Sequence, residues 1–198
     1  MIHQAAREKG LSIDRQMARI ERTIDRCDGI IDDLLDYAGA ANLDLAPIAL
    51  DTWLGAILDR QKLPDSIALE RRLGAAGAMV TVDDERLRCA IINLIENAAE
   101  AISDAPDIAE RRITVSTHAG QQAEIVIADT GPGMSADVLS RVFEPLFSTR
   151  AFGTGLGLPT VKRIIEQHGG DVVVGSVLGA GTRVQIRLPL GAAKSAAA

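Results

Sequence analysis

The sequence predicts an α+β protein, a two-layer α/β sandwich in which helices cover one face of a mixed sheet, preceded by a long N-terminal helix. Two observations lead to this prediction. A regular apolar seam runs over residues 13–38, and beyond Pro47 the pattern changes to short apolar runs bounded by Gly, Asp and Pro. At 198 residues and 47% hydrophobic content, the chain suits one core and a small extra element. We expect a helix and linker over 1–46, a folded domain over 47–190 and a disordered tail over 191–198.

The N-terminal seam has the spacing of a heptad repeat, with steps that alternate between four and three residues. Its members are Ile13, Met17, Ile20, Ile24, Cys27, Ile31, Leu34 and Ala38. So regular a stripe favours another helix as its partner, so we expect a homodimer through this segment. Packing on its own domain is the alternative. Gly39 follows as a helix stop, and 42–47 is a linker.

Beyond the linker, alternating apolar and polar residues predict strands, and apolar residues three and four apart predict helices. The predicted strands are 48–50, 67–72, 78–82, 112–118, 122–128, 171–177 and 182–188. The predicted helices are 51–62, 84–102, 135–142 and 159–168. The last two strands form a hairpin over the turn 178–181, and the last helix opens near Pro159 and closes on Gly169 and Gly170.

Composition excludes several classes of protein. The net charge is −6 and no run of Lys or Arg forms a basic stripe, so we expect no nucleic-acid partner. Cys27 and Cys89 match no metal spacing and are too few for a disulfide framework, which fits a reducing compartment. No apolar run of ~20 residues is present, so we expect a cytoplasmic domain without membrane contact of its own, whose parent protein can still be membrane-anchored.

Three polar side chains share one face of the predicted helix 84–102. Asn93, Asn97 and Glu100 stand at i, i+4 and i+7, while apolar residues supply the core side. An amide oxygen is a hard ligand suited to Mg²⁺, which takes few protein ligands and completes its shell with phosphate and water. A solvated helix face is the alternative.

Asp129 ends an apolar strand and is followed by Thr-Gly-Pro-Gly. Gly131 and Gly133 permit close backbone approach or positive φ. A buried carboxylate here can accept a hydrogen bond from an exocyclic amine, and its loss would leave the group unpaired at a cost of about 1–3 kcal/mol. The alternative is an ordinary turn between strand and helix.

Gly153, Gly155 and Gly157 alternate just before the helix that opens near Pro159. Free N–H groups and the helix dipole make such a helix start an anion cradle without a basic side chain. A flexible loop is the alternative. The Rossmann and Walker patterns are absent, and the long connection 134–157 is typical of a lid.

Five motifs stand in order along the chain: N-L-I-E-N-A-A-E at 93–100, D-T-G-P-G-M at 129–134, F-E-P-L-F-S-T-R at 143–150, G-T-G-L-G-L at 153–158 and G-A-G-T at 179–182. Together they resemble the ATP-binding domain of sensor histidine kinases, in the GHKL family shared with gyrase, Hsp90 and MutL, over roughly 47–190. The resemblance implies ATP, ADP and Mg²⁺ as ligands. It assigns Mg²⁺ to Asn97, support of the phosphates to Asn93 and the adenine amino group to Asp129.

The remaining site assignments also come from the resemblance. Gly133 would line the nucleotide pocket, and Arg150 would stand near the γ-phosphate. Phe143 and Phe147 resemble the family's phenylalanine box and would bind nucleotide; the alternative is that the two rings anchor the loop to the core. The other residues expected to bind nucleotide are Gly131, Gly153, Thr154, Gly155, Leu156, Gly157, Leu158 and Thr182.

The implied function is that of a kinase core. It would pass the γ-phosphoryl group of ATP to a His on a dimerisation helix, for relay to an Asp on a response regulator receiver domain. His3 lacks the family's phosphoacceptor pattern, so we expect 1–46 to hold the second helix of the hairpin and the acceptor His to lie outside this chain.

Two other readings stay open: a stand-alone serine kinase or ATPase of the same fold, and a nucleotide-binding dimerisation module without catalysis. Hydrolysing relatives have a Glu base where this chain has Asn93, which cannot take a proton from water, so we expect slow hydrolysis. Glu100 remains a candidate carboxylate that polarises a nucleophile.

Overall fold

The computed structural model describes residues 16–17, 20, 43–105, 107–150 and 153–191. The chain divides into two units, 1–39 and 40–198, and the second carries every element below. Of the predicted heptad seam only Met17 and Ile20 are described; both are helical, and they are 50% and 52% exposed. The rest of that prediction, and the tail from 192 onward, lie outside the described residues.

The second unit is built on a five-stranded mixed sheet in the order β2-β4-β5-β7-β6. Its strands are β2 (Ala68–Gly74), β4 (Arg112–Ala119), β5 (Gln122–Asp129), β6 (Asp171–Val177) and β7 (Gly181–Pro189). β2 runs parallel to β4, and all other neighbours are antiparallel. A separate two-stranded antiparallel sheet pairs β1 (Ala46–Ala49) with β3 (Met79–Val82).

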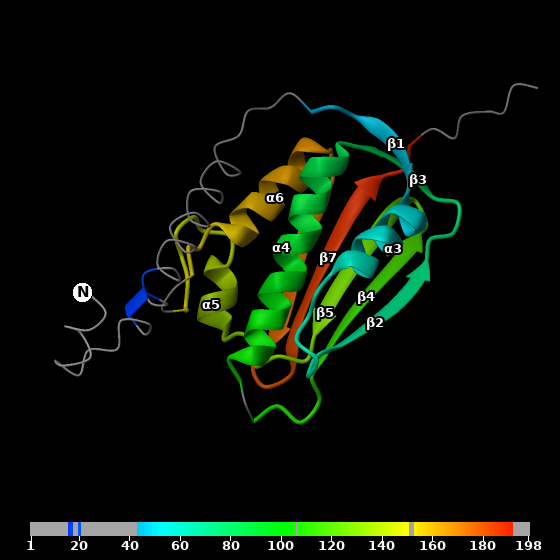
Figure 1. Ribbon diagram of the computed structural model, residues 1–198. Helices are drawn as coiled ribbons and strands as arrows, with labels where there is room; N and C mark the ends of the chain where they lie inside the picture. The colour runs from blue at the N-terminus through cyan, green and yellow to red at the C-terminus, as the bar shows by residue number, and fades with distance from the viewer. Residues whose placement is uncertain (1–15, 18–19, 21–42, 106, 151–152, 192–198) are drawn as a thin grey trace, which may run out of the picture. The chain divides into compact units, whose positions relative to one another are not determined.

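Helices α3 (Leu50–Arg60), α4 (Asp84–Ser103) and α6 (Gly157–Gln167) lie over one face of this sheet, and the short α5 (Ala136–Arg141) lies beside α4 and α6 (Figure 1). The core forms between the layers, where Ile91 and Ile95 of α4 and Ile165 of α6 are fully buried with Ile125 of β5 and Ile186 of β7. The opposite face of the sheet carries ion pairs instead, such as Arg187 with Glu124 and Asp171. The predicted two-layer sandwich is confirmed.

Each strand and helix predicted beyond the linker is present, most of them with ends shifted by one or two residues. The helix α6, for example, begins at Gly157 rather than at Pro159. Pro159 is tolerated there because the first turn of a helix needs no intrahelical N–H bond. Among the described residues no helix is both long and apolar enough to cross a bilayer.

Candidate functional site

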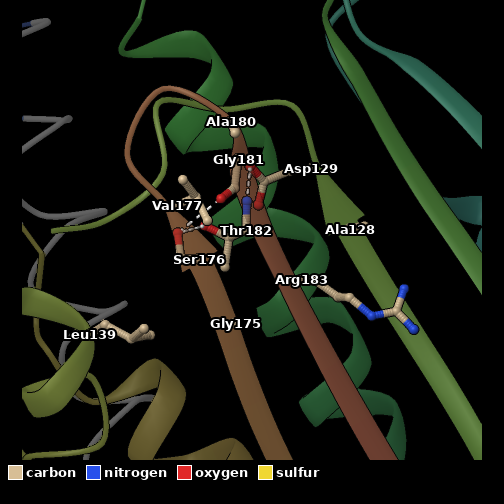
Figure 2. Close-up of a pocket in the computed structure, with 10 residues that line it drawn as sticks. All are labelled: Ala128, Asp129, Leu139, Gly175, Ser176, Val177, Ala180, Gly181, Thr182 and Arg183. Atoms are coloured by element: carbon tan, nitrogen blue, oxygen red, sulfur yellow. Dashed lines mark hydrogen bonds between the residues drawn. The ribbon is translucent and has the colours of Figure 1, made fainter. Parts of the chain in front are cut away.

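A pocket of about 510 Å³ opens beside α5, where β5 and β6 end and β7 begins (Figure 2). It is lined by Ala128, Asp129, Leu139, Gly175, Ser176, Val177, Ala180, Gly181, Thr182 and Arg183. Strand register brings its polar members together, because Asp129 pairs with Thr182 and Thr182 pairs with Ser176. The volume suits a small-molecule ligand.

Asp129 is the acidic side chain of this pocket. Its Oδ1 accepts hydrogen bonds from the backbone N–H of Gly131 at 2.7 Å and of Thr182 at 3.3 Å. Both bonds end on Oδ1, so Oδ2 has no hydrogen bond from the residues that the structure describes. Burial raises the pKa of Asp129 above its usual value, although the two N–H groups and the charge of Arg150 act in the opposite direction. The carboxylate is therefore fixed by one oxygen and offers the other as an acceptor.

Two glycines let the backbone close tightly around Asp129. A Cβ on Gly181, whose φ is 92°, would lie 2.0 Å from the carbonyl oxygen of Asp129. A Cβ on Gly133, whose φ is 66°, would lie 2.0 Å from the carbonyl oxygen of Val177. The turn between β6 and β7 thus packs directly on 129–134, and Gly179 N–H donates to Pro132 O at 2.7 Å. No larger residue fits at either position without backbone movement.

The three polar residues predicted to share a face of α4 divide into two groups in the structure. Asn93 and Asn97 face the start of α6, where a Cβ on Gly157 would lie 3.0 Å from Asn93 Oδ1 and 3.3 Å from Asn97 Nδ2. The absence of that Cβ lets the two helices approach. Glu100, one turn further along, is exposed and pairs with Arg150 instead.

The start of α6 presents unpaired backbone donors. Its N-cap is Leu156, which cannot cap with its side chain, and the helix runs for 11 residues. The first N–H groups of any α-helix have no partner within the helix, so they and the dipole attract anions. Leu156 N–H donates to Thr154 Oγ1 at 3.3 Å, and Leu158 packs against the core. The start of α6 thus forms a second polar region, beside Asn93 and Asn97.

The connection between α5 and α6 folds back on itself. Leu146 N–H donates to Gly155 O at 3.0 Å, and a Cβ on Gly155 would lie 2.6 Å from Phe147 O. Phe143 and Phe147 are half-buried; Lys162 lies over the ring of Phe143 at 5.3 Å, and Arg141 lies over that of Phe147 at 4.0 Å. Gly153 lies against Ser148, since a Cβ there would stand 2.2 Å from Ser148 Oγ.

Arg150 is held on the C-terminal half of α4. Its Nη2 donates to the backbone carbonyl of Asn97 at 2.8 Å, its Nη1 pairs with Glu100, and its Nε lies 3.7 Å from Asp104 Oδ2. Arg150 and Glu100 were expected to have separate roles, at the γ-phosphate and at the nucleophile. In this structure each is the other's partner, because an Arg charge is best compensated by nearby carboxylates.

Nine of the predicted site residues therefore fall into three groups. The structure brings Asp129, Gly131, Gly133 and Thr182 together at the pocket; it brings Asn93, Asn97 and Gly157 together between the helices; and it brings Glu100 and Arg150 together at the end of α4. α4 connects the first two groups, since a Cβ on Gly131 would lie 3.4 Å from Ala101 Cβ.

Sequence reasoning missed several residues, among them Ser176, Leu139 and Asp104. Ser176 Oγ accepts from Met134 N–H at 2.8 Å and donates to Gly181 O at 2.9 Å. Ser176 pairs with Thr182 in the hairpin of β6 and β7, a register that the predicted turn 178–181 did not give. Nothing in the local pattern singled out Leu139 in the pocket or Asp104 beside Arg150.

A metal at this site would be held by few protein ligands. Over the described residues, no group of three or more His, Cys, Asp and Glu side chains is placed to hold a metal ion. Amide oxygens at Asn93 and Asn97 remain, beside a helix start that attracts phosphate. This set fits Mg²⁺, which commonly takes one or two protein ligands together with substrate phosphates and water.

Comparison with known proteins identifies the fold's family. The profile described as "Histidine kinase-, DNA gyrase B-, and HSP90-like ATPase" matches residues 82–192, more than half of the chain. The chain belongs to this family. The match includes every motif from Asn93 to Thr182, so the resemblance inferred from the sequence is confirmed.

Individual members of the family agree with this assignment. The chain is 31% identical to sensor histidine kinase ZraS of Escherichia coli K12 over 179 residues, which are 88% of this chain and 38% of that protein. It is 32% identical to sporulation kinase C of Bacillus subtilis over 135 residues, 68% of this chain and 31% of that protein. The chain thus spans less than two fifths of either relative.

Solved structures show the same fold. Full-length ShkA in complex with AMPPNP superposes with a TM-score of 0.76 at 25% identity, covering 91% of this chain and 39% of that one. The mycobacterial sensor histidine kinase MprB superposes with a TM-score of 0.61 at 28% identity, covering 74% of this chain and 97% of that one.

Proposed function

We propose that this chain is the ATP-binding kinase core of a two-component sensor histidine kinase. It would bind Mg·ATP and transfer the γ-phosphoryl group to a His on a dimerisation helix, for relay to an Asp of a response regulator receiver domain. The observation that carries the proposal is the arrangement of the predicted residues along α4. Asn93 and Asn97 lie against the glycine-rich start of α6. Ala101, further along the same helix, lies against Gly131 beside Asp129.

Asp129 supports adenine as the base. The carboxylate oxygen that its backbone donors leave free would accept a hydrogen bond from an exocyclic amine. Guanine carries a carbonyl oxygen at the corresponding position, and two acceptors would then face each other in a buried place. A site that hydrogen-bonds a substrate group rejects analogues that lack it, because its own buried group is left unpaired.

Asn93, Asn97 and the start of α6 support the triphosphate. The amide oxygen of Asn97 would hold Mg²⁺, with Asn93 beside it, and the uncapped N–H groups of α6 would hold phosphate oxygens. Bound Mg²⁺ would neutralise charge on the transferred phosphoryl group. The chain's own contribution would be to position and orient the phosphates, because neither Asn can accept a proton from an attacking group.

Arg150 would have to leave Glu100 and Asp104 to reach a phosphate. Those carboxylates are 62% and 68% exposed, and pairs of this kind contribute about 0–1 kcal/mol. A triphosphate carries more charge than either carboxylate and can compete for the guanidinium. We therefore retain Arg150 as a γ-phosphate ligand that is stored on α4 before nucleotide binds.

Phosphoryl transfer can be tested directly with γ-labelled ATP. The 198-residue chain is incubated with Mg·ATP and a separate helical-hairpin fragment that carries the family's phosphoacceptor His. We expect acid-labile, base-stable label on the fragment and none on the chain, with label abolished by Asn97→Ala. Acid-stable label on Ser or Thr, or release of phosphate without any labelled protein, would contradict a histidine kinase and favour the serine kinase or ATPase.

A further inference from the structure

His168 ends α6 at the opposite end of the helix from Gly157 and is only 7% exposed. Its Nδ1 lies 2.7 Å from the backbone carbonyl of Ile164, and its Nε2 lies 2.9 Å from the backbone N–H of Asp83. A carbonyl can only accept and an N–H can only donate. The two partners therefore require a neutral imidazole with its proton on Nδ1 and an acceptor at Nε2.

Asp83 is the N-cap of α4. Its Oδ1 accepts from Arg86 N–H at 3.1 Å within the first turn of the helix, and its Oδ2 accepts from Asp44 N–H at 3.0 Å. The N–H groups of Arg86 and Asp44 hold the pKa of Asp83 below its usual value, against the opposing effect of burial. The backbone N–H that binds His168 thus belongs to a residue that is itself fixed in place.

The Asp83–His168 hydrogen bond and the cluster of Asn93, Asn97 and Gly157 both join α4 to α6, at different places along the two helices. α4 and α6 pack against each other, and they run antiparallel because the start of α4 meets the end of α6. From Asp83 to Asn93 is ten residues, about 15 Å of helix; from His168 back to Gly157 is eleven residues, about 16 Å. The two helices are therefore tied at one end by the Asp83–His168 bond and come into contact at the other end, through Asn93, Asn97 and Gly157.

We propose that His168 is a positioning residue for the phosphate end of the site: its hydrogen bond to Asp83 sets how far α6 lies along α4, and so where the start of α6 stands against Asn93 and Asn97. This inference rests on the proposed function for the identity of the ligand. The space between the two helices is small here, since a Cβ on Gly157 would lie 3.0 Å from Asn93 Oδ1. Helix shifts below 1 Å would change that contact, whereas the pocket around Asp129 is set by strand register and would not follow.

Two substitutions separate the hydrogen bond to Asp83 from the bulk of the side chain. In His168→Gln the side-chain amide reaches the place of Nε2 and can still accept from Asp83 N–H. In His168→Asn the amide reaches only the place of Nδ1, so it keeps the bond to Ile164 and loses the one to Asp83. Both variants retain a buried polar side chain, and thermal melts give the temperature range in which both are folded.

The test compares these variants in the full chain, first without ligand and then with two ligands. In ligand-free ¹H–¹⁵N spectra, we expect His168→Asn to shift the side-chain amide signals of Asn93 and Asn97, and His168→Gln to leave them near their wild-type positions. Adenosine should bind both variants within twofold of wild type. Mg·AMPPNP should bind His168→Asn at least about fivefold more weakly, and His168→Gln within twofold.

Unshifted Asn93 and Asn97 signals in folded His168→Asn would overturn the positioning role whether or not nucleotide binds. Equal weakening of adenosine and Mg·AMPPNP would also overturn it, because a general loss of folding has no preference for the phosphate end. Failure of wild-type protein to bind either ligand would overturn the proposed function instead, and the spectra of the ligand-free protein would still decide the role of His168.

Discussion

Among single residues, Asp129 is subject to two opposing effects: burial disfavours its charge, and backbone N–H groups favour it. Burial disfavours its charge and raises its pKa, while Gly131 and Thr182 hold Oδ1 by their N–H groups. A folded-state pKa above the unfolded value means that the folded chain binds the proton more tightly. The stability that this provides is present at low pH and is lost as pH rises from about 3.8 through the raised pKa. At neutral pH the ionised carboxylate therefore costs stability.

The variant Asp129→Asn separates the contribution of this side chain to stability from its contribution to ATP binding. The amide oxygen can still accept from Gly131 and Thr182, and no charge is buried, so the free energy of unfolding at pH 7 should be unchanged or higher. The amide nitrogen would replace the free carboxylate oxygen and present a donor to the adenine amino group, so ATP affinity should fall by about 1–3 kcal/mol, roughly 5–150-fold. Thermal melts between pH 4 and 8 and titration with a fluorescent ATP analogue measure both. Retained ATP affinity in the variant would remove Asp129 from the site.

At the scale of elements, the turn between β6 and β7 fixes the pocket because its backbone touches the segment after β5. Gly179 and Gly181 both have positive φ, at 81° and 92°. They differ in surroundings: a Cβ on Gly179 would meet nothing within 4 Å, and one on Gly181 would lie 2.0 Å from Asp129 O. An alanine at either position would therefore have a strained backbone, but only the alanine at 181 would also clash with a neighbouring residue.

Gly181→Ala and Gly179→Ala should accordingly differ. In Gly179→Ala the only cost is the strain of an alanine at positive φ. The free energy of unfolding should fall by about 1–2 kcal/mol, and ATP affinity should be retained. Gly181→Ala must also move the backbone of Asp129, so it should cost at least about 3 kcal/mol and weaken ATP binding in the folded fraction. Urea unfolding and ATP titration measure these effects. Equal losses in both variants would show that strain alone, and not the packing of this turn on Asp129, sets the effect.

Local patterns in the sequence were enough to predict the elements beyond the linker and to place some residues of the candidate site near one another. Helical spacing placed Asn93 and Asn97 on one face, and strand alternation followed by glycines placed Asp129 at a strand end, because both signals depend on neighbours a few residues away. The Arg150–Glu100 pair joins side chains 50 residues apart through an irregular connection. The Asp83–His168 bond joins residues 85 apart. Neither contact produces a periodic pattern in the sequence, so both become apparent only in the folded structure.

At the scale of the whole molecule, α4 organises the described part of the fold. Its apolar face, including Leu87, Ile91 and Ile95, is fully buried against the sheet and α6. Its polar face carries Asn93 and Asn97 toward the start of α6, and its last turns hold Arg150. The helix that completes the core is thus the helix that joins the adenine end of the proposed site to the phosphate end.

Calorimetric titration of the wild-type chain and of Asn97→Ala with ATP, ADP and GTP, each with and without Mg²⁺, measures base selectivity and metal dependence in one experiment. We predict that ATP binds at least about tenfold more tightly than GTP, that Mg²⁺ strengthens ATP binding, and that Asn97→Ala loses the Mg²⁺-dependent part while keeping metal-free ADP binding within a few fold. Equal affinity for ATP and GTP, or an Asn97→Ala variant that responds to Mg²⁺ as wild type does, would contradict a site that reads adenine at Asp129 and holds the metal at Asn97.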